Sequence, residues 1–130
     1  MSQATNEALE TLQQFFNAVM SQRLESIMGF FTEDAQMFSP LGTFPARLDG
    51  RAAIQKQFEA ILQLFQAPGG TGPVKIEPHD MHARELAPNA VMFTFHLRLP
   101  GPLHRRSILL MRTGNAWRIA HIHASIASPT

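Results

Sequence analysis

Histidine side chains supply most of the reactive chemistry of this chain, which has six histidines but no cysteine and no tyrosine. An unperturbed histidine titrates near neutral pH and can therefore act as a general acid or base. His96 shares one face of a predicted strand with Thr94 and Arg98, and the opposite face of that strand is uniformly apolar. These three side chains either face solvent or line a cavity, where His96 would be the only obvious acid or base.

Two further histidines, His121 and His123, stand two positions apart in the last predicted strand. Their imidazoles therefore lie on one face, about 7 Å apart, and could form part of a metal site. A catalytic metal needs a third ligand and supporting carboxylates, and none of the three aspartates, Asp34, Asp49 and Asp80, is placed near this pair by the pattern. We predict no metal site and expect both histidines to satisfy buried polar groups on a face that meets a second subunit.

The other charged clusters are interpreted as solvated surface. His79 and His82 flank Asp80 where a proline interrupts a strand, which is typical of an exposed edge. The only dense basic run is HRR at 104–106, and successive strand residues point to opposite faces, so we interpret it as a solvated hairpin. Eleven lysines and arginines against ten acidic residues leave a net charge of +1. Neither nucleic acid nor an anionic membrane is therefore an expected partner.

The length of 130 residues is usual for one domain with a single core. The opening residues MSQATNEALE lack the basic start and apolar core of a signal peptide. No apolar stretch approaches the length of a membrane span. We therefore expect one domain, residues 1–130, in the cytoplasm, and no motif in the chain predicts a cofactor.

Apolar residues at helical spacing predict three helices in the first half of the chain, at 5–20, 24–31 and 49–65. A Pro- and Gly-rich segment at 67–73 ends the third helix, and the pattern beyond it alternates. Phe15 and Phe58 lie on the apolar faces of the first and third helices. Aromatic residues at this spacing are mostly core, although a pocket in such a fold takes its lining from the core.

Alternating patterns predict five strands, at 35–39, 74–86, 90–99, 104–113 and 116–128. The last strand places Ala120, Ile122 and Ala124 on a small apolar face and Trp117 on the opposite, amphipathic face. Helices followed by an antiparallel meander predict an α+β fold, with three N-terminal helices packed on one curved, mainly antiparallel sheet. A cleft between the helices and the concave face is the expected place for a small ligand.

Three segments carry a resemblance to a known family: FFTEDAQMFSPLG, LDGRAAIQKQFE and MRTGNAWRIAHIHAS. They resemble the NTF2-like superfamily, in particular its SnoaL-like branch, which includes ketosteroid isomerases and polyketide cyclases. The third segment is similar to the association domain of calcium/calmodulin-dependent protein kinase II, where a Trp precedes a similar H-x-H-x-S ending. The resemblance implies an NTF2-like cone over nearly the whole chain. It says less about function, because one fold hosts many chemistries.

Compared with ketosteroid isomerases, the chain lacks both catalytic side chains that the resemblance implies. Ser39 stands where those enzymes have the aspartate that moves the proton, and Phe15 stands where they have the tyrosine of the oxyanion hole. A serine hydroxyl without an activating base cannot abstract a proton from carbon at neutral pH. Steroid isomerase activity is therefore not expected, and His96 is the candidate catalytic residue.

The resemblance to association domains favours an inward direction for His96, because a pocket arginine of those domains falls at that place. The predicted ligand-binding residues line the cleft from helices and strands and are Phe15, Ser39, Phe58, Thr94, His96, Arg98, Ala120, Ile122 and Ala124. Another pocket arginine of those domains falls where Ala124 stands, which predicts a more apolar, less anionic ligand.

The sequence thus leads to two hypotheses of function. In the first, the protein is a small-molecule pocket protein, an isomerase or cyclase acting on an apolar polyketide- or steroid-like compound. In the second, it is a non-catalytic ligand-sensing or oligomerisation module similar to a kinase association domain. Under both hypotheses we expect a homodimer through the outer face of the sheet, because the last two strands are apolar on both faces.

Overall fold

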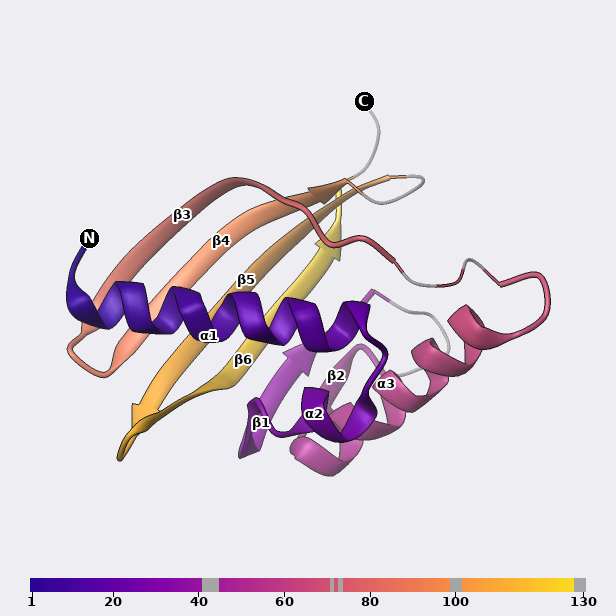
Figure 1. Ribbon diagram of the computed structural model, residues 1–130, viewed down its shortest axis with the longest axis horizontal. Coiled ribbons are helices and arrows are strands. Elements are labelled where there is room, and N and C mark those ends of the chain that lie inside the picture. The colour runs from indigo at the N-terminus through magenta and orange to yellow at the C-terminus, as the bar shows by residue number, and fades with distance from the viewer. Residues whose placement is uncertain (41–44, 71, 73, 99–101, 128–130) are drawn as a thin grey trace.

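The computed structural model describes residues 1–40, 45–70, 72, 74–98 and 102–127 (Figure 1). In chain order the elements are α1 (Gln3–Met20), α2 (Leu24–Met28), β1 (Phe31–Phe38), β2 (Arg47–Asp49), α3 (Arg51–Gln66), β3 (Pro78–Ala87), β4 (Ala90–Arg98), β5 (Leu103–Thr113) and β6 (Ala116–Ile126). The predicted strand end at Leu99, the turn residues Pro100 and Gly101, and the strand end at Ser128 lie outside the described residues.

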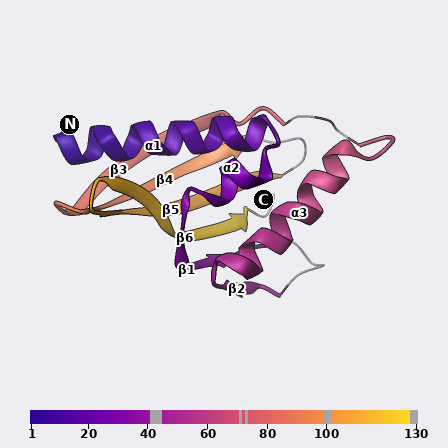
Figure 2. The same cartoon turned by 60° about the horizontal axis from the view of Figure 1, so that its bottom comes forward.

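The strands form one sheet in the order β2-β1-β6-β5-β4-β3. All neighbouring pairs are antiparallel except β1 and β6, which run parallel. Helix α1 contacts β3, β4 and β6, whereas α3 contacts β1 and β2, and both helices cover the same face of the curved sheet (Figures 1 and 2). The predicted α+β fold with one curved, mainly antiparallel sheet is confirmed.

Helix α1 begins earlier than predicted because Ser2 caps it. The backbone N–H of Thr5 donates to Ser2 Oγ at 3.1 Å, which satisfies one of the free donors of the first turn. The amphipathic pattern then buries one side of the helix, where Leu12 is fully enclosed in the core. The aromatic side chain of Phe15 continues this buried face towards the C-terminal half of the helix.

The prediction of three N-terminal helices is correct only in part. Helix α2 has only five residues, and α3 follows two strands instead of one. The missed strand, β2, is three residues long and pairs with the end of β1, so no alternation could reveal it. Gly50 then starts α3 with a φ of 92°, a conformation that residues with a Cβ rarely adopt. Among the described residues, no helix has the length and apolarity needed to cross a membrane.

Strand β6 contains a bulge that the sequence did not predict. Leu110 pairs with Ile119, whereas the preceding Leu109 pairs with His121, so Ala120 has no partner on β5. The bulge reverses the alternation: Trp117 and Ile119 are buried in the first half of the strand, and Ile122 and Ala124 in the second. The expectation that Trp117 lies on the outer face is therefore wrong. Its indole Nε1–H instead donates to Glu7 Oε1 of α1 at 3.0 Å.

Candidate functional site

A cavity of about 310 Å³ lies between α1, α3 and the inner face of the sheet. Its helical walls include Phe15 and Phe16 from α1 and Phe58 from α3. The strands contribute Phe95 from β4 and Ala124 from β6. The cavity is therefore enclosed mainly by apolar side chains, in the volume range that is usual for small-ligand pockets.

Aromatic contacts fix the shape of the helical walls. The ring of Phe15 meets that of Phe58 edge to face, with centroids 6.4 Å apart, and meets Phe31 in the same manner at 5.6 Å. The neighbouring ring of Phe16, also on α1, packs edge-on against Phe95 of β4 at 5.6 Å. Edge-to-face packing is the preferred geometry of aromatic pairs, so these walls are held without a ligand.

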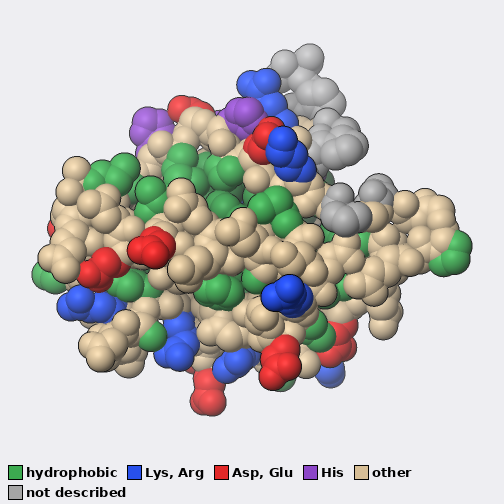
Figure 3. Space-filling model, in the orientation of Figure 1, with side chains coloured by type: hydrophobic (Ala, Val, Ile, Leu, Met, Phe, Trp, Pro, Cys, Tyr) green, Lys and Arg blue, Asp and Glu red, His purple; other side chains and the backbone are tan. Residues whose placement is uncertain are grey.

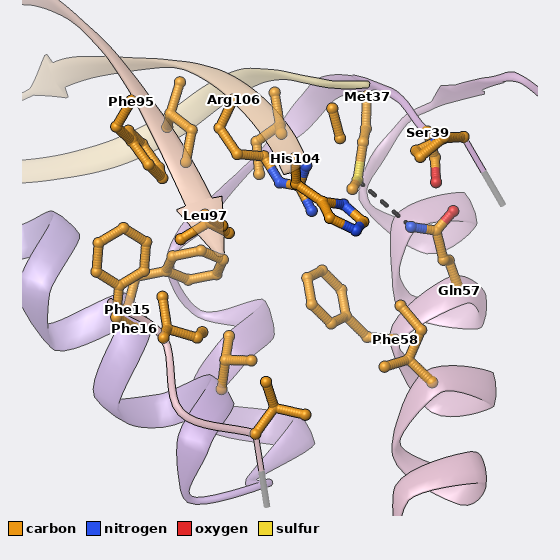
Figure 4. A pocket seen from close by; sticks show the side chains of 18 of the residues that line it. Phe15, Phe16, Met37, Ser39, Gln57, Phe58, Phe95, Leu97, His104 and Arg106 are labelled. Carbon is orange, nitrogen blue, oxygen red and sulfur yellow. Dashed lines mark hydrogen bonds between the residues drawn. The ribbon is translucent and has the colours of Figure 1, made fainter. Parts of the chain in front are cut away.

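Two basic side chains of β5, His104 and Arg106, enter this apolar space (Figure 4). The strand register explains their direction. Arg106 lies between Phe95 of β4 and Ala124 of β6, in one row of inward-facing residues across the sheet. Because Ala124 is small, the cavity extends beside the arginine instead of being filled by its neighbour.

The environment of Arg106 is unusual for a charged group. Burial lowers the pKa of its guanidinium from the ordinary value, since the charged form loses hydration. Its Nη1 donates to the backbone oxygen of Arg105 at 3.0 Å. Among the described residues, no carboxylate forms an ion pair with it. The protein therefore holds a cation at the wall of an apolar cavity without a counter-ion from the described part of the chain.

His104 is also partly desolvated. Burial lowers the pKa of its imidazole, and the positive charge of Arg106 lowers it further. Its Nδ1 is buried and has no hydrogen-bond partner among the described residues. A histidine with a lowered pKa is neutral at neutral pH, so it can accept a proton or, as the Nδ1–H tautomer, donate a hydrogen bond.

Gln57 of α3 adds a polar group on the opposite wall. It is 1% exposed, its Nε2 donates to the sulfur of Met37 at 3.8 Å, and its Oε1 has no partner among the described residues (Figure 4). Ser39, directly after the end of β1, is buried and lines the same cavity. Buried polar atoms normally have hydrogen-bond partners, so Gln57 Oε1, which has none among the described residues, is available to a guest molecule.

The structure brings together five of the predicted ligand-binding residues. Phe15, Ser39, Phe58, Ile122 and Ala124 all line the cavity. That they bind a ligand remains a prediction.

The predicted positions of Thr94, His96, Arg98 and Ala120 in the cavity are wrong. The buried apolar face of β4 forms the cavity wall, so the alternate residues Thr94, His96 and Arg98 point to the outer face of the sheet. Ala120 occupies the bulge of β6 and does not line the cavity. His96 therefore cannot act as an acid or base in this cavity.

The other histidines with described contacts lie outside the cavity. His96 Nδ1 and His82 Nε2 approach Asp80 at 3.9 and 3.2 Å, on the exposed edge formed by β3. Figure 3 shows histidine side chains gathered at that edge. His121 meets the ring of Phe38 edge to face and His123 meets it at a tilt on the outer face, with ring centroids 5.7 and 5.4 Å apart. Within the described ranges, no three His, Asp or Glu side chains are arranged to hold a metal ion.

Sequence reasoning missed the two basic residues of the cavity, His104 and Arg106. The signal was present, because Ile108 and Leu110 have the same parity and are deeply buried. Extending that alternation towards the start of β5 places both basic residues on the inner face. The interpretation of the run at 104–106 as solvated surface is therefore wrong for His104 and Arg106, which line the cavity.

Comparisons with known proteins agree with this architecture. A family model described as a SnoaL-like domain matches residues 8–129. A protein with a cystatin-like fold from Caulobacter vibrioides superimposes with a TM-score of 0.81 at 21% identity, over 98% of this chain and 92% of that one. No curated protein matches the chain significantly.

Two further solved structures have names that suggest a function. A ketosteroid isomerase-like protein from Erwinia carotovora atroseptica gives a TM-score of 0.76 at 10% identity, covering 99% of this chain and 100% of that one. A protein from Thiobacillus denitrificans, named for the calcium/calmodulin-dependent protein kinase type II association domain, gives 0.70 at 20% identity, covering 91% and 93%. At these identities the likeness shows the fold alone.

Proposed function

Because this chain belongs to the SnoaL-like domain family, within the NTF2-like superfamily, we propose that its 130 residues form one domain that binds a small organic molecule in the cavity between α1, α3 and the sheet. The observation that carries the proposal is an apolar cavity of about 310 Å³ whose wall also holds polar atoms without a hydrogen-bond partner in the described part of the chain. His104 Nδ1 and Gln57 Oε1 are two such atoms. A ligand with an apolar body and a polar end would occupy the space and satisfy those atoms.

A substitution that fills the cavity tests this proposal. Ala124→Leu places a larger side chain beside Arg106, where the small alanine now leaves room. We expect it to weaken binding of 4-phenylbutan-1-ol, measured by calorimetry, at least about tenfold. His123→Ala is the matched control, because it alters the adjacent residue on the outer face of the same strand.

The expected result is loss of binding in Ala124→Leu and wild-type binding in His123→Ala, with both variants folded by circular dichroism. Binding that survives Ala124→Leu and disappears in His123→Ala would place the ligand on the outer face and contradict the proposal.

A second candidate function is proton transfer on the bound molecule, as an isomerase or cyclase of an apolar polyketide- or steroid-like compound requires. His104 supports it, because burial lowers its pKa and keeps the imidazole available as a base at neutral pH. The base would then be His104, and not His96 as predicted from the sequence.

Exchange of carbon-bound protons for deuterium measures this activity directly. We expect the protein to accelerate exchange next to the carbonyl of 4-phenylbutan-2-one in D₂O, followed by NMR, and His104→Gln to abolish the acceleration. His96→Gln serves as the control and should exchange at the wild-type rate. No acceleration by the wild type would leave a non-catalytic ligand-sensing or oligomerisation module as the better description.

A homodimer through the outer face of the sheet completes the proposal. Phe38 is 38% exposed there and lies against His121, which in turn pairs with Leu109 of β5. Aromatic and aliphatic groups on an open sheet face favour two-fold association. Light scattering should give twice the chain mass of 14.5 kDa for the wild type and the monomer mass for Leu109→Glu. A monomeric wild type at micromolar concentration would contradict this part of the proposal.

A further inference from the structure

Arg106 lies at the cavity wall as a cation that no carboxylate of the described residues neutralises. On the sheet it stands between Phe95 and Ala124, neither of which can interact with its charge as an ion. Its one hydrogen bond within the described residues goes to the backbone oxygen of Arg105, and no carboxylate of that part of the chain pairs with it. A desolvated charge without a counter-ion is unfavourable, so an anion supplied from outside the chain would stabilise this arrangement.

We infer that the ligand of this cavity carries a single carboxylate, which the guanidinium of Arg106 binds. The inference rests on the proposed binding function and specifies the chemistry of the ligand. A guanidinium has a planar set of donors that matches the two oxygens of a carboxylate, and such charge-assisted bonds are the strong ones.

His104 supplies a second donor at the same place. It stands two residues before Arg106 in β5, so both side chains leave the strand on its inner face, and the charge of Arg106 contributes to the lowered pKa of His104. The buried Nδ1 of His104 lacks a partner among the described residues and can donate to a carboxylate oxygen. A carboxylate bound by Arg106 thus also satisfies this otherwise unpaired imidazole nitrogen.

The charge of the site favours a monoanion. Arg106 is the only lysine or arginine among the described residues that line the cavity. One cation in apolar surroundings balances one negative charge, whereas a phosphate monoester would bring a second charge without a partner.

The volume limits the size of the apolar body. An engineered apolar cavity of about 150 Å³ binds benzene, and the cavity here has about 310 Å³. A ligand with roughly a dozen non-hydrogen atoms therefore fits. The aromatic walls formed by Phe15, Phe58 and Phe95 suit an aryl or alkyl chain of that size.

The inference is tested with two probes that have the same shape and differ in charge, 4-phenylbutanoate and 4-phenylbutanamide. Calorimetry at pH 7.5 should show that the wild type binds the acid at least about tenfold more tightly than the amide, as expected for a charge-assisted bond. Arg106→Gln should remove this preference and leave amide binding nearly unchanged. Arg98→Gln is the matched control, because it removes an exposed arginine on the outer face of β4 and should retain the preference.

The outcomes distinguish failure of the carboxylate inference from failure of the proposed binding function. Equal binding of acid and amide by the wild type, or an undiminished preference in Arg106→Gln, overturns the inference and leaves the proposed function intact. If neither the acid nor the amide binds, both the carboxylate inference and the proposed function are overturned. Should Arg106→Gln fail to fold, Arg106→Lys is used: it keeps the charge but not the planar donor pair, and an acid affinity equal to that of the wild type would contradict bidentate recognition.

Discussion

Replacement of Arg106 by methionine should make the protein without ligand more stable. Methionine keeps an unbranched apolar stem in the space of the arginine and removes the guanidinium, whose pKa is lowered by burial and which has no ion pair among the described residues. Replacement of buried ionic groups by apolar side chains of similar volume is neutral or stabilising by about 1–4 kcal/mol. Here no carboxylate of the described part offsets the desolvation of the cation, so we expect a gain of about 1–3 kcal/mol in the free energy of unfolding.

Urea and thermal unfolding provide the assay. For a chain of 130 residues, each 1 kcal/mol raises the melting temperature by about 4 °C, so the expected rise is about 4–12 °C. Arg98→Met is the control, because its arginine is exposed and the change should remain within about 0.5 kcal/mol. A loss of more than about 1 kcal/mol in Arg106→Met, with Arg98→Met unchanged, would refute the view that the partial burial of the Arg106 charge is unfavourable.

Three other predictions concern stability. Burial and then the charge of Arg106 lower the pKa of His104 below the usual 6.5, and burial and then the neighbouring His123 lower that of His121. Below about pH 6.5 the unfolded chain therefore binds more protons than the folded one, so the melting temperature should be highest above this pH and fall as the pH drops from 8 to 5. The fall should be smaller in a variant with glutamine at both positions, and an equal fall would contradict this assignment. Phe31→Ala should cost about 3–5 kcal/mol in urea unfolding because the ring is fully buried, and a cost below about 1 kcal/mol would be inconsistent with that burial. Gln22→Gly should stabilise by up to about 1 kcal/mol because Gln22 has a φ of 57°, whereas a loss of stability would show that its side chain matters more than backbone strain.

The helices and most strands could be predicted from periodicity because burial selects apolar residues at fixed spacing. Strand β4 shows what periodicity predicts and what it leaves open. Its alternation gives two faces, and the burial of Phe93 and Phe95 shows that the apolar face is the inner one. The hypothesis that His96 faces a cavity required the polar face to point inward, which would have left those phenylalanines on the outer face. Burial of the two phenylalanine rings is more favourable than burial of the single imidazole of His96, which predicts that the apolar face of β4 points inward.

The bulge in β6 is harder to predict. Ala120 differs in no obvious way from its neighbours, and the alternation on both sides of it looks continuous in the sequence. Only pairing with β5 and β1 reveals the extra residue, since the partners of Ile119 and His121 are out of step. Parity therefore gave the correct face for Ile122 and Ala124 and the wrong one for Trp117. Arg106 was missed for a different reason, because a cation partly buried at an apolar cavity wall is rare and the pattern gives no sign of what would neutralise it.

The central position of β6 also determines when this site can form during synthesis. This strand lies between β1 and β5 and makes the only link in the sheet between the β1–β2 hairpin and the β3–β5 meander, within the described residues. Until residues 116–126 have left the ribosome, the two parts of the sheet share no strand pairing, and Arg106 lacks Ala124 at its side. Pairing of β1 with β6 is also the most distant in sequence, which makes it a slow step of folding. A nascent chain that lacks residues 116–126 therefore lacks the β6 wall of the cavity, so a ligand bound there would selectively stabilise chains that already contain this strand.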